Sequence, residues 1–233
     1  MNKILNLNTF KQMGQCFQKQ STNNDENILK MKRILLDKNM LPEKSMIIEH
    51  NNKPLILFDL NGTLTNNWKD RIEENRGLLF RPGINNLRRL KGKFDLGIYS
   101  CMRDYNVNNT VQRLEQTLGR GIFKVVLNQT HCDKATLEIC ERLNKPYAMT
   151  KPIKKHSNNL NRTLSKIILV DDTYEKILKE EIDNLVLIPT WSKKTDDNTL
   201  EMLVTYLLRY IPSNGDVRRK TNIVNKKMAT LKD

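Results

Sequence analysis

Short apolar runs alternate along this chain with segments of helical periodicity. Three of the runs are apolar throughout, or nearly so: Leu55–Phe58, Leu96–Tyr99 and Ile167–Val170. Continuous runs of this kind are typical of strands in a parallel sheet that is covered on both faces. Two further runs, Ile122–Leu127 and Leu185–Ile188, predict additional strands. The chain therefore contains the strands of one buried sheet.

The segments between these strands predict helices. We expect helices at Arg81–Leu90, at Asp104–Leu118, from Thr173 onward, and at Asp197–Tyr210. Gly119 suits the end of the second helix, because glycine adopts the backbone conformation that commonly terminates helices. Strands that alternate with helices predict an α/β fold with a doubly wound, mostly parallel sheet.

The pattern divides the chain into three parts. Residues 1–50 form an N-terminal extension, with a polar linker and one expected helix at 27–39. Its first 20 residues carry lysines and no acid, which fits either a mitochondrial presequence or Asn- and Gln-rich disorder. Residues 51–211 contain the predicted strands and helices and form the core domain. Residues 212–233 form a basic C-terminal tail that is too polar to add much core.

The net charge of the chain indicates which kinds of molecule it could bind. The chain of 233 residues has 40 basic and 26 acidic side chains, a formal net charge of +14. This charge favours a phosphorylated or acidic protein as partner, with nucleic acid or a ribonucleoprotein as an alternative. A Lys- and Asn-rich composition without functional meaning explains it as well. No apolar run approaches the roughly 18 residues that a membrane span needs.

The number and spacing of the cysteines indicate the cellular compartment of the protein. The four cysteines show no CxxC spacing and no matched set of metal ligands; they are Cys16, Cys101, Cys132 and Cys140. We expect them to be reduced, which predicts an intracellular protein. A nuclear or cytoplasmic location is favoured, and a mitochondrial location is the alternative.

Polar residues follow three of the apolar runs, where each strand is expected to end. Asp59 follows the first run, Ser100 the second, and Asp171 and Asp172 the third. The carboxyl ends of parallel strands meet at one edge of a sheet, where such folds bind ligands. Carboxylates there suit attack on phosphorus or Mg²⁺ binding, and Ser100 with Lys151 suits a phosphoryl group. Taken singly, each residue also fits a turn or a helix cap, so the case depends on their order and spacing.

These segments resemble a known family. The stretch Asp59-Leu60-Asn61-Gly62-Thr63 is similar to the Asp-x-Asp-x-Thr motif of the haloacid dehalogenase (HAD) superfamily. Arg81-Pro82-Gly83, Ser100, Lys151 and Asp171-Asp172 resemble further motifs of its FCP/SCP (NIF-like) phosphatase domains. The resemblance covers essentially the whole core. It implies a HAD Rossmann-like core, and the stretch between 65 and 79 is too short for a separate cap domain.

The resemblance also implies roles for individual residues. Asp59 matches the nucleophile, which is also an Mg²⁺ ligand, and Asn61 stands where the family has its general acid/base. The phosphate-binding positions are Thr63, Ser100 and Lys151, and the metal positions are Asp59, Asn61 through its backbone carbonyl, Asp171 and Asp172. Substrates in the family are typically phosphoserine or phosphothreonine in proteins, including the tail of RNA polymerase II.

Asn61 departs from the motif. An amide cannot donate or accept the proton that a carboxyl group transfers, and general acid–base catalysis typically contributes about 10²–10⁴-fold. Two functions follow. One is an Mg²⁺-dependent phosphatase-like protein that acts on phosphoproteins through an aspartyl-phosphate, with weakened activity. The other is a catalytically inactive pseudophosphatase that serves as a protein or ribonucleoprotein binding module, to which the basic residues of 218–227 could add nucleic-acid contacts.

Overall fold

The computed structural model describes residues 53–67, 77–191 and 193–230. The N-terminal extension, its expected helix and the presequence alternative lie outside the described residues. Most of the stretch for which no cap domain is expected, residues 68–76, lies outside them as well. No helix in the described part of the chain combines the length and the apolar character that a membrane crossing requires.

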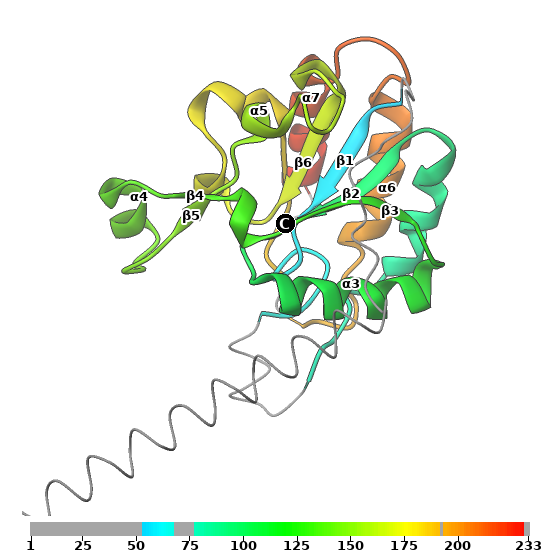
Figure 1. The fold of residues 1–233 in the computed structure, drawn as a ribbon. Helices are drawn as coiled ribbons and strands as arrows, with labels where there is room; N and C mark the ends of the chain where they lie inside the picture. The colour runs from blue at the N-terminus through cyan, green and yellow to red at the C-terminus, as the bar shows by residue number, and fades with distance from the viewer. Residues whose placement is uncertain (1–52, 68–76, 192, 231–233) are drawn as a thin grey trace, which may run out of the picture. The chain divides into compact units, whose positions relative to one another are not determined.

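A five-stranded sheet forms the centre of the described domain (Figure 1). All four strand pairings are parallel. In spatial order the strands are β3 (Phe123–Leu127), β2 (Asp95–Tyr99), β1 (Leu55–Phe58), β6 (Ile167–Asp171) and β7 (Leu185–Leu187). The predicted α/β fold with a parallel sheet is confirmed.

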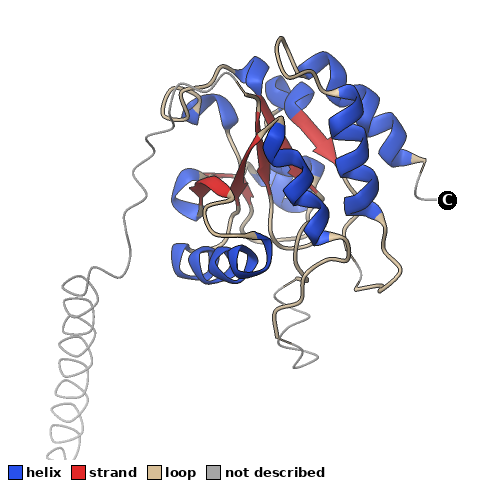
Figure 2. Ribbon diagram, turned by 90° about the vertical axis from the view of Figure 1, so that its right-hand side faces the viewer, coloured by secondary structure: helices blue, strands red, loops and turns tan. Residues whose placement is uncertain are grey.

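Helical segments and loops cover both faces of the sheet, which explains why its strands are apolar in continuous runs (Figure 2). One face packs against η1 (Ile84–Gly92), α3 (Asp104–Leu118), α6 (Thr199–Tyr210) and α7 (Arg218–Ala229). The other face packs against Ile153 of α5 (Ile153–His156), and against Leu160 and Ile177 from loops. Within β1, Ile56 and Phe58 face the first layer and Leu55 and Leu57 the second. The sheet is therefore doubly covered, as expected.

A small arm departs from this core between β3 and Lys151. It follows η2 (Gln129–His131) and consists of β4 (Asp133–Lys134), α4 (Leu137–Arg142) and β5 (Met149–Thr150). The two strands pair antiparallel with each other and not with the main sheet. Figure 1 shows the arm extending away from the sheet. Its last strand leads directly into Lys151.

The prediction of a helix from Thr173 onward is wrong. The segment contains two short 3-10 helices instead, η4 (Tyr174–Lys176) and η5 (Lys179–Asn184); a third, η3 (Leu164–Lys166), precedes β6. Ile177 has an extended backbone and buries its side chain in the core, which ends the first turn after three residues. An interior contact therefore interrupts the helical periodicity.

The interpretation of residues 212–233 as a tail that adds little core is also wrong. Residues 218–229 form α7, and Val217, Val224 and Met228 are buried among the side chains of the first layer. Thr221 is buried too, and its hydroxyl donates a 2.6 Å hydrogen bond to the Asp183 carbonyl. The basic residues lie on the outer side. High mean polarity concealed a narrow apolar stripe with helical spacing.

This packing predicts that the C-terminal helix stabilises the domain. The Met228 side chain is 1% exposed, so Met228→Ala should leave a cavity and lower the free energy of unfolding by about 2–5 kcal/mol. The exposed neighbour Lys227 provides the control, because Lys227→Ala should change stability by less than about 0.5 kcal/mol. Urea-induced unfolding measures both, and equal effects of the two substitutions would contradict this packing.

A buried ion pair joins the segment after the first loop to the start of α6. Arg81 donates hydrogen bonds of 3.1 and 2.8 Å to the Asp197 carboxylate, and others to the Pro189 carbonyl and the Thr199 hydroxyl. Burial raises the pKa of Asp197, but the hydrogen bonds and charge of Arg81 outweigh it and hold that pKa below its usual range. The pair therefore favours the folded state only while Asp197 is ionised.

Acid should remove the contribution of the Arg81–Asp197 ion pair to the free energy of unfolding. It is present above the ordinary Asp pKa of about 3.9 and is lost as the pH falls through the lower folded-state value. At pH 7, Asp197→Asn should lower the free energy of unfolding by about 1.5–3 kcal/mol, the usual range for a hydrogen bond to a charged group. The deficit should shrink at pH 3, whereas the exposed neighbour Asp196, changed to Asn, should show no such trend. Urea unfolding of wild type and both variants at several pH values from 7 to 3 measures this difference. If the stability loss of Asp197→Asn were the same at pH 7 and pH 3, the ion pair would not depend on ionised Asp197.

Candidate active site

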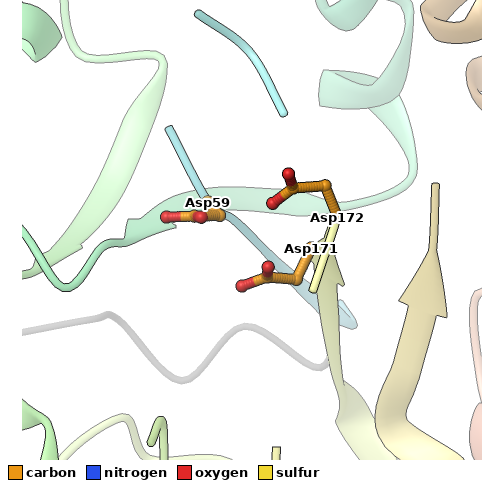
Figure 3. A group of neighbouring side chains, drawn as sticks. All are labelled: Asp59, Asp171 and Asp172. Atoms are coloured by element: carbon orange, nitrogen blue, oxygen red, sulfur yellow. The ribbon is translucent and has the colours of Figure 1, made fainter. Parts of the chain in front are cut away.

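Three carboxylates meet at the carboxyl edge of the sheet. Asp59 follows β1, Asp171 ends the neighbouring strand β6, and Asp172 comes next. One oxygen from each lies within 4.8 Å of the other two, and Figure 3 shows the three side chains at the ends of their strands. The strand order reverses at β1, and such switch points are where open α/β sheets bind ligands.

Lys151 pairs with two of these carboxylates. Its Nζ lies 3.0 Å from Asp59 Oδ1 and 2.5 Å from Asp171 Oδ2, and the side chain is 0% exposed. The residue follows β5 of the arm, and its backbone N–H donates a 2.7 Å hydrogen bond to the Lys176 carbonyl. The structure thus brings Lys151 together with the strand-end aspartates, and its predicted contact with a phosphoryl group stays a prediction.

Lys176 is a second cation at the same place, and the sequence motifs did not indicate it. Its Nζ lies 2.6 Å from Asp59, 3.1 Å from Asp171 and 3.7 Å from Asp172. The residue ends η4, and its side chain is 17% exposed. One signal was available, since Lys176 stands four residues after Asp172, a spacing at which opposite charges pair within one helical turn.

The charges of this cluster stabilise one another. Burial opposes ionisation of Asp59, but the ammonium groups of Lys151 and Lys176 outweigh it and hold the pKa of this carboxyl below its usual range. Burial likewise opposes the charge of both lysines, but Asp171 and Asp59 raise the pKa of each. Burial is the largest influence on Asp172 and raises its pKa. Asp59 is therefore an ionised carboxylate at neutral pH.

The turn after Asp59 lies against Asp172. Gly62 has a φ of 81°, and a Cβ at this position would clash with Asp172 Oδ2. The Gly62 carbonyl accepts a 2.8 Å hydrogen bond from the Trp191 backbone N–H, and the Thr190 hydroxyl donates a 2.8 Å bond to Asp172. The neighbouring Asn61 is partly exposed on the same turn. Only a glycine permits this close approach.

The two predicted hydroxyl positions differ in their surroundings. Ser100 is buried and follows β2, which lies beside β1, so it stands at the same edge as Asp59. Its Oγ accepts a 3.4 Å hydrogen bond from the Met102 backbone N–H. Thr63 is fully buried, and its hydroxyl has no hydrogen-bond partner among the described residues. The topology brings Ser100 to the cluster, whereas Thr63 lies inside the turn.

The donor set fits a hard divalent cation. Carboxylate oxygens are the ligands that Mg²⁺ prefers, and Asp59, Asp171 and Asp172 converge closely enough to share one ion. These three residues would hold it. The Lys176 ammonium group already contacts oxygens of the same three carboxylates. Lys176 and a bound Mg²⁺ ion would therefore use the same ligands.

Comparison with known proteins agrees with this architecture. A family model for the NLI interacting factor-like phosphatases matches residues 54–218. The chain belongs to this family. The NIF-like phosphatases lie within the haloacid dehalogenase superfamily, so the resemblance drawn from the motifs is confirmed. The matched region includes the three aspartates, both lysines and the start of α7.

Two solved structures are similar to this NIF-like chain. One is Fcp1, an essential RNA polymerase II CTD phosphatase, with 14% identity and a TM-score of 0.42 over 78% of this chain and 49% of that one. The other is a fission yeast Fcp1 variant bound to beryllium fluoride, with 14% identity and a TM-score of 0.45 over 89% and 53%. The chain thus spans about half the length of either. No curated protein sequence matches it.

The turn geometry predicts a specific effect of substitution at Gly62. Gly62→Ala combines a left-handed backbone with a clash against Asp172, so it should lower the free energy of unfolding by about 1–3 kcal/mol or more. Gly121 also has a positive φ (69°) but nothing within 4 Å of a built Cβ, so Gly121→Ala isolates the backbone effect. Thermal and urea unfolding should show the larger loss at Gly62. The same loss in both variants would exclude the contact with Asp172.

Proposed function

We propose that this NIF-like protein is an Mg²⁺-dependent phosphatase of low turnover that acts on phosphoserine or phosphothreonine in proteins. The observation that carries the proposal is the buried Asp59 carboxyl group, paired with Lys151 and Lys176 beside Asp171 and Asp172. A carboxylate fixed in this way suits nucleophilic attack. Membership of a phosphatase family supports the reaction class.

Asp59 supplies the nucleophile. One of its oxygens forms a bond to phosphorus as the bond between phosphorus and the seryl or threonyl oxygen breaks, which yields an aspartyl-phosphate. Water then attacks this phosphorus, releases inorganic phosphate and restores the carboxylate. Bound Mg²⁺ supplies positive charge that offsets the charge of the transferring phosphoryl group. Lys151 supplies fixed positive charge, and Ser100 a hydroxyl donor, at the same edge of the sheet.

Asn61 determines how fast these steps run. The leaving alkoxide of serine needs a proton, and the attacking water must lose one, but an amide side chain does neither. An aryl phosphate has a better leaving group and suffers less in the first step. Turnover of seryl phosphate should therefore be slow, and hydrolysis of the aspartyl-phosphate should be slow for every substrate.

A pseudophosphatase that binds a phosphorylated or acidic protein is the second candidate. Asn61 favours a pseudophosphatase, because the site keeps its charged groups but lacks the residue that would transfer a proton. The outer side of α7 also presents exposed basic residues, Arg219, Lys220, Lys226 and Lys227. Nucleic-acid binding through these residues and an intracellular location stay predictions.

Hydrolysis assays on three proteins distinguish the two candidates. Wild type should hydrolyse p-nitrophenyl phosphate slowly in the presence of Mg²⁺, and Asp59→Asn should abolish this activity. Asn61→Asp should raise turnover of a phosphoserine peptide by about 10²–10⁴-fold. Asn61→Gln is the matched control, since it changes the side chain without supplying a proton donor, and it should bring no gain.

The other outcomes are equally informative. Inactive wild type together with active, Mg²⁺-requiring Asn61→Asp would assign the natural protein to the binding class. Turnover that survives in Asp59→Asn would refute the aspartyl-phosphate. A folded Asn61→Asp variant without activity on either substrate would refute a phosphatase site altogether.

A further inference from the structure

Lys176 stands where three carboxylates converge. Its Nζ lies within 4 Å of oxygens from Asp59, Asp171 and Asp172, the same three residues whose oxygens could bind one cation. Among these three carboxylates, Lys151 pairs with Asp59 and Asp171. Of these two lysines, Lys176 is therefore the one that takes up the position of a shared counter-ion.

The two lysines also differ in their freedom to move. The Lys151 side chain is fully enclosed by the protein. The Lys176 side chain is 17% exposed and projects from a single 3-10 turn. Its four-carbon stem is flexible, and a strongly hydrated ammonium group gains solvation when it swings outward. Lys176 can therefore leave the carboxylates without a change in the sheet.

We propose that Lys176 is a tethered counter-cation that competes with Mg²⁺ for the carboxylates of Asp59, Asp171 and Asp172. This inference rests on the metal site of the proposed function and adds a determinant of metal affinity. In the metal-free state the ammonium group offsets part of the negative charge of the three carboxylates. An Mg²⁺ ion at the same oxygens meets a positive charge at close range, so its binding requires displacement of Lys176 Nζ.

Three consequences follow for the protein itself. Affinity for Mg²⁺ is lower than the three carboxylates alone would give. Mg²⁺ binding moves the Lys176 ammonium group toward solvent, while Lys151 stays in place. The metal-free domain depends on Lys176 for stability, because without it three carboxylates share a single lysine.

Isothermal titration of the full chain with MgCl₂ tests the first consequence. Lys176→Met should bind Mg²⁺ at least about tenfold more tightly than wild type. A positive charge this close typically lowers the proton affinity of a carboxylate by about one to three powers of ten, and we expect it to lower the affinity for Mg²⁺ in the same direction. Lys179→Met removes an exposed lysine three residues away and should match wild type. If Lys176→Met binds no more tightly than wild type, whether both bind or neither does, the proposal is overturned.

A measurement on wild type covers the case in which Lys176→Met fails to fold. Brief acetylation of the intact protein, followed by peptide mass spectrometry, reports the accessibility of each lysine. Saturating Mg²⁺ should raise the labelling rate of Lys176 severalfold and leave Lys179 unchanged. Unchanged labelling of Lys176 under conditions where calorimetry shows bound Mg²⁺ would overturn displacement. Neither readout requires turnover, so failure here is distinct from failure of the phosphatase assay.

Discussion

Carboxylates that are withdrawn from water must be paired with cations, and the described domain is arranged around this constraint. Parallel pairing of β1 with β6 brings Asp59 and Asp171 to the same edge, where both are buried. Two lysines meet them there, one after the arm and one at the end of η4. The hydrogen bond from the Lys151 N–H to the Lys176 carbonyl joins the backbones of these two segments beside the charged cluster.

The parallel sheet was accessible from the sequence, because strands buried on both faces must be apolar throughout. The spatial order of its strands was not, because the apolar runs do not specify which strands are neighbours. The helix at 104–118 was accessible too, since its apolar stripe and terminal glycine agree. The strand-end aspartates and Ser100 could be proposed because they directly follow buried runs whose carboxyl ends meet at one edge of the sheet. Lys151 has no such local signal, and only its order and spacing relative to the other motifs of the family pointed to it.

Other features depend on contacts that local sequence does not express. The short turns after Asp171 form because Lys176 reaches the carboxylates and Ile177 enters the core, and both contacts join distant segments. The helix at 218–229 is polar on average, so its only sequence signal is the spacing of Thr221, Val224 and Met228. That spacing can be recognised as a buried face only once β7 and α6 are known to pack against it. Pairing of lysines with particular aspartates has no sequence signal beyond the spacing of Asp172 and Lys176.

Asn61 and Lys176 act on the same electrostatic balance. An aspartate at position 61 would add a fourth negative charge to a turn that already lies against Asp172. With asparagine there, three carboxylates face two ammonium groups, and the metal-free cluster carries a formal charge of −1 rather than −2. On the roles proposed above, the asparagine that takes the place of the proton-transferring group also lowers the negative charge that a divalent cation would offset. We therefore expect metal affinity and proton transfer to be weakened together rather than independently.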